Sequence, residues 1–271
     1  MKSALQNDYE AISMNNRHYL EPARCADVIK DSKWVVVLTG AGVSTEAGIP
    51  DFRGPRGLYV TRQYDPEKVF DIDWFSRDPR FFYEFSRDFI DLMKNTGPTF
   101  THRFLATLEQ QGRLKGVITQ NIDALHQVAG SKKVVELHGS YRAATCHGCG
   151  RHYADLTYAW WDAAMGDSPR PPVALCAACK GVLKPDIVFF GEPVHAIIEA
   201  QQMVTECDLL LVLGSSLNVT PASLLPHFTT RTTIVVNKGH VTLAKASNRH
   251  FVEKELDAYC REVAVCLGIA E

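Results

Sequence analysis

The stretch Trp34-Val-Val-Val-Leu-Thr-Gly40-Ala-Gly42-Val-Ser44 decides the fold. Its apolar part, Trp34–Thr39, is typical of a strand that is covered on both faces of a parallel sheet. Glycine has no Cβ, so Gly40 and Gly42 let backbone amides approach a phosphate group closely. We expect a helix to begin near Ser44 and to point its positive end at that group. Thr45 stands where the third glycine of G-x-G-x-x-G belongs, so an ordinary tight turn is an equal alternative for this stretch alone.

Further apolar runs alternate with helical patterns along the rest of the chain. The other expected strands are Gly116–Thr119, Val134–Leu137, Asp186–Phe190, Leu209–Gly214 and Thr233–Asn237. The expected helices are Glu21–Lys30, Thr101–Gln110, Ala196–Glu206 and Ala222–Thr229. This alternation predicts an α/β fold with a Rossmann-like, doubly wound parallel sheet, whose ligands bind at the carboxyl ends of the strands.

Two stretches interrupt the alternation and predict insertions. Residues 54–100 are rich in aromatic and charged side chains, and we interpret them as a helical insertion. Residues 141–184 hold four paired cysteines, and we expect a small zinc-binding module with a short helix near Tyr158–Ala164. The Rossmann-like domain is then discontinuous and comprises residues 1–53, 101–140 and 185–271.

Composition excludes several classes of protein. The chain has 271 residues, 46% of them hydrophobic, and a net charge of −2, which is unlike the basic footprint of a nucleic-acid-binding protein. Its longest apolar run, Leu209–Leu213, is far shorter than the roughly 18 residues that a membrane span needs. Residues 1–16 carry Asp8 and Glu10 and no long apolar run, so we expect no targeting signal and a cytoplasmic protein that binds neither nucleic acid nor membranes.

The cysteine spacing predicts a structural metal site. Two Cys-x-x-Cys pairs, Cys146/Cys149 and Cys176/Cys179, are separated by the 26 residues 150–175. Each pair can point two sulfurs at one ion, and four thiolates leave a zinc ion no open coordination position. A disulfide or redox role is the alternative.

Polar side chains follow two neighbouring expected strands. Gln120, Asn121 and Asp123 come after one strand, and His138 comes after the next. In a parallel sheet both sets lie at the same edge, where an amide and a carboxylate can bind a ribose. Histidine is the natural proton carrier there, because its unperturbed pKa is about 6.5. We therefore interpret His138 as catalytic, with a surface or satisfied core histidine as the alternative.

These motifs together resemble the sirtuin family. The similar segments are Gly40–Ser44, Gly48-Ile-Pro-Asp-Phe-Arg53 with Gly57-Leu58-Tyr59, Gln120–Asp123, Val135–Ser140 and Gly181–Glu192, and the strand ends near Gly214 and Asn237 follow. The resemblance covers most of the chain, from about Ala26 to Asn237, and fades from about His240 onward. It implies an NAD-dependent protein-lysine deacylase, a transferase that cleaves NAD to nicotinamide and passes the acyl group to ADP-ribose.

The resemblance also implies roles for individual residues. His138, Asn121 and Asp123 are expected to be catalytic. The expected NAD-binding residues are Gly40, Ala41, Gly42, Ser44, Asp51, Phe52, Arg53, Tyr59, Gln120, Asn121, Ile122, Asp123, Gly214, Ser215, Ser216 and Asn237. Phe52 and Arg53 belong to a lid over the nicotinamide ribose. Cys146, Cys149, Cys176 and Cys179 are the expected ligands of one structural zinc ion.

The substrate implied by the resemblance is an acyl-lysine peptide that pairs as an added strand beside Val188 and Phe189, with Tyr83 also expected at the substrate. A plain buried strand is the alternative for Val188 and Phe189, and a turn residue is the alternative for Asn237. Family members that remove acidic acyl groups carry Tyr-x-x-Arg; here Ser86 replaces the arginine, which favours acetyl or longer apolar acyl groups. A shift of one residue would restore the guanidinium at Arg87. A mono-ADP-ribosyltransferase and a non-catalytic NAD-responsive binding protein remain alternatives, and the oligomeric state is left open.

Overall fold

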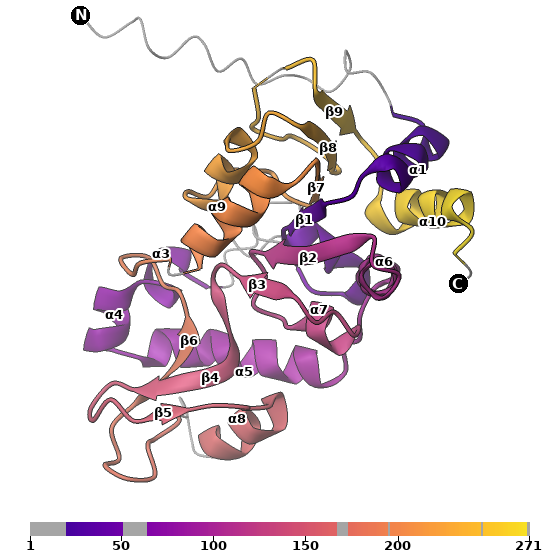
Figure 1. Cartoon of the computed structure of the whole chain (residues 1–271). Coiled ribbons are helices and arrows are strands. Elements are labelled where there is room, and N and C mark those ends of the chain that lie inside the picture. The colour runs from indigo at the N-terminus through magenta and orange to yellow at the C-terminus, as the bar shows by residue number, and fades with distance from the viewer. Residues whose placement is uncertain (1–19, 51–63, 167–172, 195, 245, 270–271) are drawn as a thin grey trace, which may run out of the picture.

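The computed structural model describes residues 20–50, 64–166, 173–194, 196–244 and 246–269. Six parallel strands form the main sheet in the order β3-β2-β1-β7-β8-β9 (Figure 1). They are β1 (Val35–Thr39), β2 (Leu114–Thr119), β3 (Val134–Glu136), β7 (Leu209–Leu213), β8 (Thr232–Val236) and β9 (Arg249–Val252). Counted within this sheet alone the order is 3-2-1-4-5-6, the Rossmann order, which confirms the predicted fold.

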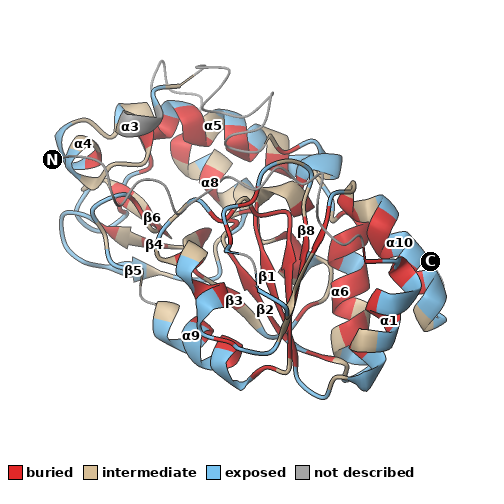
Figure 2. Ribbon diagram, turned by 90° about the horizontal axis from the view of Figure 1, so that it is seen from above, coloured by how far each residue is buried: buried red, intermediate tan, exposed pale blue. Residues whose placement is uncertain are grey.

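Helices cover both faces of this sheet because its strands are apolar on both sides. Every residue of β1 and β7 is buried. Figure 2 shows the buried strands between α9 on one side and α1, α6 and α10 on the other. The bounds of these helices are α1 (Pro22–Asp31), α6 (Phe100–Gln110), α9 (Ile197–Glu206) and α10 (Leu256–Leu267). Side chains of β1 alternate between the two cores: Val35 and Val37 face α1, α6 and α10, whereas Val36 and Leu38 face α9.

The start of α6 is stabilised by a capping box and by an aspartate of α10. Thr99 and His102 form a capping box. Asp257 of α10 accepts hydrogen bonds from the backbone N–H groups of Phe100 and Thr101 at 2.9 and 3.0 Å. A carboxylate at a helix N-terminus also interacts favourably with the helix dipole. Asp257 therefore holds α10 against the first turn of α6.

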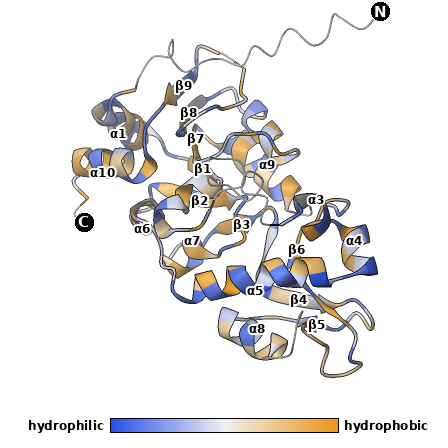
Figure 3. Ribbon diagram, turned by 180° about the vertical axis from the view of Figure 1, so that it is seen from behind, coloured by the Kyte–Doolittle hydropathy of each residue, from blue (hydrophilic) through white to orange (hydrophobic). Residues whose placement is uncertain are grey.

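A second core lies at the other end of the molecule, below the main sheet in Figure 1. It joins the predicted helical insertion to a three-stranded antiparallel sheet of order β5-β4-β6. Figure 3 shows alternating hydrophobic and hydrophilic residues along α5, as expected of a helix that packs on this core. The elements are α3 (Pro66–Val69), α4 (Ile72–Arg77), α5 (Arg80–Lys94), β4 (Gly139–Cys146), β5 (His152–Tyr153), α8 (Tyr158–Met165) and β6 (Leu183–Ile187).

Several expectations for individual elements are wrong. The strand expected at Asp186–Phe190 in the main sheet is β6, which pairs with β4 in the small sheet. No α-helix begins at Ser44; two short 3-10 turns, η2 (Ala41–Val43) and η3 (Thr45–Ala47), stand there because Gly48 takes a left-handed conformation and ends the second turn. The helix expected at Ala222–Thr229 is a 3-10 helix, η4 (Ala222–His227), with Pro226 inside it.

Candidate active site

The loops after β1 and β7 touch each other at the point where the strand order reverses. Gly40 N–H donates to Leu213 O at 3.1 Å, and Gly42 N–H donates to Gly214 O at 2.9 Å. A Cβ on Gly42 would lie 2.7 Å from the Cα of Gly214, and Gly214 itself has a φ of 63°. Only glycine fits such a contact between two backbones. The contact lies at the switch point of the sheet, the place where doubly wound folds bind their ligands.

A buried polar cluster lies next to the contact between the loops that follow β1 and β7, which we call the glycine crevice. Ser44 Oγ donates to Asp123 Oδ2 at 2.7 Å and accepts from Asn121 Nδ2 at 3.1 Å. Asp123 Oδ1 accepts from the backbone N–H of Leu125 at 2.9 Å, at the start of the short helix α7 (Leu125–Val128). Burial raises the pKa of Asp123, and these hydrogen bonds oppose that shift. The structure therefore brings Ser44, which follows β1, into contact with Asn121 and Asp123, which follow β2.

His138 lies at the same edge, just after β3. Its Nδ1 is 2.8 Å from the carbonyl oxygen of Gln120, so Nδ1 carries the proton and Nε2 keeps a free lone pair. Burial lowers the pKa of His138, and the hydrogen bond to Gln120 partly opposes this. The imidazole is consequently neutral near pH 7 and can accept a proton through Nε2.

The remaining described NAD-site candidates line the same edge. Gln120 Nε2 donates to Ser215 Oγ at 2.9 Å and so links the ends of β2 and β7. Ser216 accepts from the backbone N–H of Thr242 at 2.9 Å, and Asn237 donates through Nδ2 to Gly239 O at 3.4 Å after β8. Asp51, Phe52, Arg53 and Tyr59 lie outside the described residues.

A cavity of about 170 Å³ joins this polar cluster to the apolar face of α5. Five of the predicted NAD-site residues line it: Ala41, Ser44, Asn121, Ile122 and Asp123. Its other lining residues are Ile49, Pro50, Tyr64, Phe85, Asp88, Phe89 and Leu92. The cavity thus combines a few hydrogen-bonding groups with a mostly apolar lining, as small-molecule sites commonly do.

The structure separates the three expected substrate residues. Tyr83 and Phe189 are fully buried, and Tyr83 donates to Leu183 O at 2.6 Å, so neither side chain is available at the surface. Val188 is half-buried, and its backbone N–H donates to His138 O at 2.9 Å. Side chains alternate along an extended segment, so Phe190, at 52% exposed, lies on the side of Val188.

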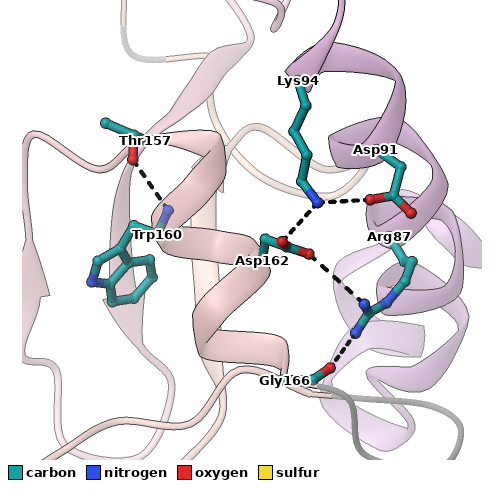
Figure 4. Close-up of polar contacts among 7 residues, drawn as sticks. All are labelled: Arg87, Asp91, Lys94, Thr157, Trp160, Asp162 and Gly166. Atoms are coloured by element: carbon teal, nitrogen blue, oxygen red, sulfur yellow. Dashed lines mark hydrogen bonds and ion pairs between the residues drawn. The ribbon is translucent and has the colours of Figure 1, made fainter.

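The arginine that acidic acyl groups would need is not found in the cavity at either of the two candidate positions, 86 and 87. Ser86 is buried, and its Oγ is 3.0 Å from the hydroxyl of Tyr141. Arg87 points to α8, where its Nη2 donates to Gly166 O at 2.7 Å and its Nη1 lies 3.9 Å from Asp162 (Figure 4). Of the titratable side chains of α5, Asp88 lines the cavity.

Four thiols of the small module form a site that fits a zinc ion. The Sγ atoms of Cys146, Cys149, Cys176 and Cys179 all lie within 4.8 Å of one another. The distances Cys146–Cys179 and Cys149–Cys176 are 3.5 and 3.8 Å. A tetrahedron with zinc–sulfur bonds of about 2.3 Å needs sulfurs about 3.8 Å apart, so the geometry fits a structural zinc ion.

The two histidines of the module have other partners. His147 stacks on the ring of Phe75 at 5.9 Å, and His152 pairs with Asp186 at 3.0 Å. Backbone N–H groups of Cys149 and Gly181 point at Cys146 Sγ and Cys179 Sγ at 3.4 and 3.3 Å. Such N–H groups stabilise thiolates and support the four-cysteine ligand set.

Comparison with known proteins gives a consistent result. Residues 40–221 match the model of the Sir2 family. An NAD-dependent protein deacetylase of Thermotoga maritima is 44% identical over 218 residues, which are 79% of this chain and 85% of the relative. NAD-dependent protein deacylase 2 of Archaeoglobus fulgidus is 43% identical over 210 residues, covering 76% and 79%.

Solved structures agree. One described as Sir2-p53 peptide-NAD+ is 38% identical, has a TM-score of 0.80, and covers 93% of this chain and 100% of its own. Another, described as Sir2Tm bound to a propionylated peptide, is 36% identical with a TM-score of 0.79 and the same coverage.

Proposed function

The chain belongs to the Sir2 family, and on that premise we propose that it is an NAD-dependent protein-lysine deacylase, a transferase that consumes NAD. The observation that carries this proposal is the orientation of His138. Its Nδ1–H is held by Gln120 O at 2.8 Å, at the strand edge that also carries the glycine crevice. A neutral base beside a dinucleotide crevice is what deprotonation of a ribose hydroxyl requires.

The proposed NAD site spans the switch point of the sheet. Gly40, Ala41, Gly42 and Gly214 would face the pyrophosphate, and Ser215, Ser216 and Asn237 would face the adenosine end. Ser44, Asn121, Ile122 and Asp123 would hold the nicotinamide and its ribose, together with Gln120 and the lid residues Asp51, Phe52, Arg53 and Tyr59. The close approach of Gly42 to Gly214 supports this placement, because it holds the ends of β1 and β7 together at the switch point of the sheet.

The chemistry divides between co-substrate and protein. NAD, when bound, supplies the ADP-ribosyl group that accepts the acyl group. Nicotinamide is the part of NAD that is released. Asn121 and Asp123 are buried and connected through Ser44, so they can hold a ribose without rearranging. His138 Nε2 would accept the proton of a ribose hydroxyl. The other predicted catalytic roles, those of Asn121 and Asp123, are part of the same proposal.

The proposed substrate is an acyl-lysine in an extended peptide. The peptide would lie along the segment of Val188 and Phe190, next to His138. Acetyl and apolar acyl groups are favoured, because Arg87 is held by Gly166 and Asp162 and the cavity presents Asp88 instead. A succinyl carboxylate would find no positioned guanidinium among the described side chains that line the cavity.

Two further proposals concern organisation and location. We assign residues 1–53, 101–140 and 185–271 to the NAD domain, 54–100 to the helical insertion and 141–184 to the zinc module.

Among the described residues, no helix is both long and apolar enough to span a bilayer. A reducing, cytoplasmic location agrees with eight free cysteines, four of them arranged for metal, and fractionation of expressing cells tests it.

The test of the proposed function is a deacylation screen. Acetyl-, succinyl-, lipoyl- and myristoyl-lysine peptides are incubated with NAD, and the products are identified by mass spectrometry. We expect free lysine, nicotinamide and an acylated ADP-ribose in equal amounts from the acetyl peptide. Transfer of labelled ADP-ribose to protein, independent of acyl-lysine, would support an ADP-ribosyltransferase instead. Tight NAD binding without any turnover would support a binding protein.

A further inference from the structure

A side chain of α8 links the zinc module to the candidate NAD site by a hydrogen bond. Tyr158, the first residue of that helix, donates from its hydroxyl to the backbone oxygen of Asp123 at 2.9 Å. Asp123 is the buried carboxylate that binds Ser44 and lines the cavity. One hydrogen bond therefore runs from the four-cysteine module into the predicted nucleotide pocket.

The backbone at Asp123 needs such support. The next residue, Ala124, has a φ of 58°, a left-handed conformation that is unfavourable for a residue with a Cβ. This turn aims the Asp123 carboxylate at Ser44 on one side and at the N–H of Leu125 on the other. The hydroxyl of Tyr158 holds the Asp123 carbonyl from outside the turn, so it helps to fix the orientation of the whole peptide unit.

The helix α8 is itself held firmly, so the hydroxyl of Tyr158 is presented at a defined place. Thr157 caps the helix by accepting from Trp160 N–H at 3.1 Å, immediately before Tyr158 (Figure 4). Asp162 on the same helix binds Lys94 of α5 at 2.7 Å, and Trp161 Nε1 donates to Tyr141 O at 2.7 Å. These contacts join α8 to both α5 and β4.

The phenol stays protonated over the accessible pH range. Burial raises the pKa of Tyr158 well above its usual value, and the nearby charge of Asp123 adds to that shift. The ring also packs against Phe89 and Tyr141, at 6.2 and 6.0 Å between centroids. Removal of the hydroxyl alone would therefore leave the packing in place.

We propose that Tyr158 is a positioning residue through which the zinc module sets the shape of the NAD pocket. The inference rests on the proposed function, since it takes the Asp123 cluster to be the nucleotide site. The zinc module would then act on affinity for NAD and not only on the stability of the fold, although none of its four cysteines lines the cavity.

The test compares two matched variants of the full, zinc-loaded chain. Tyr158→Phe removes the hydrogen bond to Asp123. Tyr141→Phe removes a hydroxyl from the same aromatic cluster, where it contacts Ser86 at 3.0 Å, and Tyr141 is not among the residues that line the cavity. NAD affinity is measured by titration calorimetry without peptide, zinc content by metal analysis, and folding by thermal unfolding.

We expect Tyr158→Phe to weaken NAD binding about fivefold, the equivalent of about 1 kcal/mol for one hydrogen bond. Zinc content should stay at one ion per chain in both variants, and Tyr141→Phe should bind NAD as the wild type does. An unchanged NAD affinity in Tyr158→Phe, or equal weakening in both variants, would overturn the inference. If the wild-type chain itself does not bind NAD, the proposed function falls, and the first titration shows it.

Discussion

Acidification from neutral pH to about pH 5 should destabilise this fold through His102 and His126, which pack together beneath the strand edge. Both rings are almost inaccessible to solvent, with centroids 4.6 Å apart. His102 Nδ1 accepts from Thr99 N–H at 3.2 Å, and His126 Nε2 is 3.0 Å from Thr39 Oγ1. Among the described residues, the other ring nitrogens have no hydrogen-bond partner. Among the described residues, no acidic side chain contributes to the pKa of either ring, so nothing offsets the effect of burial.

The size of the effect follows from the pKa of His102. Burial, with a smaller contribution from Arg103, lowers that pKa from 6.5 to about 3. Below pH 6.5 the unfolded chain takes up a proton that the folded chain refuses, so stability is full above pH 6.5 and is lost as the pH falls towards 3. Linkage gives a loss of about 2 kcal/mol at about pH 5 from this residue alone. His126, whose pKa is also lowered by burial, adds to it.

The assay is urea unfolding at about pH 7.5 and about pH 5 for the wild type and His102→Asn. Asparagine keeps a short acceptor for Thr99 N–H but does not titrate. We expect the wild type to lose about 2 kcal/mol more than the variant between these two pH values. The comparison cancels the titrating groups that do not interact with His102; the charge of His102 also contributes to the lowered pKa of His126, so His126 does not cancel completely. An equal loss in both proteins would refute the reasoning, because it would mean that His102 takes up its proton without unfolding.

Three further predictions concern other parts of the molecule. Cys146→Ala should lose zinc and aggregate, because it removes one of four metal ligands. Cys266→Ala, at an exposed thiol outside the cluster, is the control and should keep one zinc per chain. A soluble, active, zinc-free Cys146→Ala would contradict the structural role of the metal. Gly42→Ala should cost about 1–3 kcal/mol and weaken NAD binding, because the new Cβ would lie 2.7 Å from Gly214 Cα; Gly97→Ala, whose Cβ meets nothing within 4 Å, is the control. A succinyl peptide should react at least tenfold more slowly than the acetyl peptide, because its carboxylate would be desolvated without a partner, which costs about 1–3 kcal/mol or more. Equal rates would show that another cation reaches the acyl group.

The sequence predicted the main sheet because β1 and β7 are uninterrupted apolar runs, and such runs need cover on both faces. It also predicted the zinc module, since the Cys-x-x-Cys spacing depends only on local geometry. It did not find β9 or α10. The strand Arg249–Val252 has two buried residues and two half-buried ones, so its pattern is weak without the neighbouring β8.

The errors at the candidate site have tertiary causes. Asp186–Phe190 is apolar enough for the main sheet, but its backbone continues the pairing of β6 with β4, which no local pattern reveals. Phe189 and Phe190 are chemically equal in sequence. Only the register against Phe70 and His138 turns Phe189 into the core and leaves Phe190 exposed. The contact between Tyr158 and Asp123 joins residues 35 apart and could not be read from either segment.

Deacetylation of an acetyl-lysine peptide in the presence of NAD, measured for the wild type and for His138→Ala, tests the role of His138 as the base. We expect the wild type to form nicotinamide and free lysine one for one. We expect the variant to keep its fold and its zinc but to yield no deacetylated peptide. Undiminished deacetylation by the folded variant would contradict the assignment of His138 as the base.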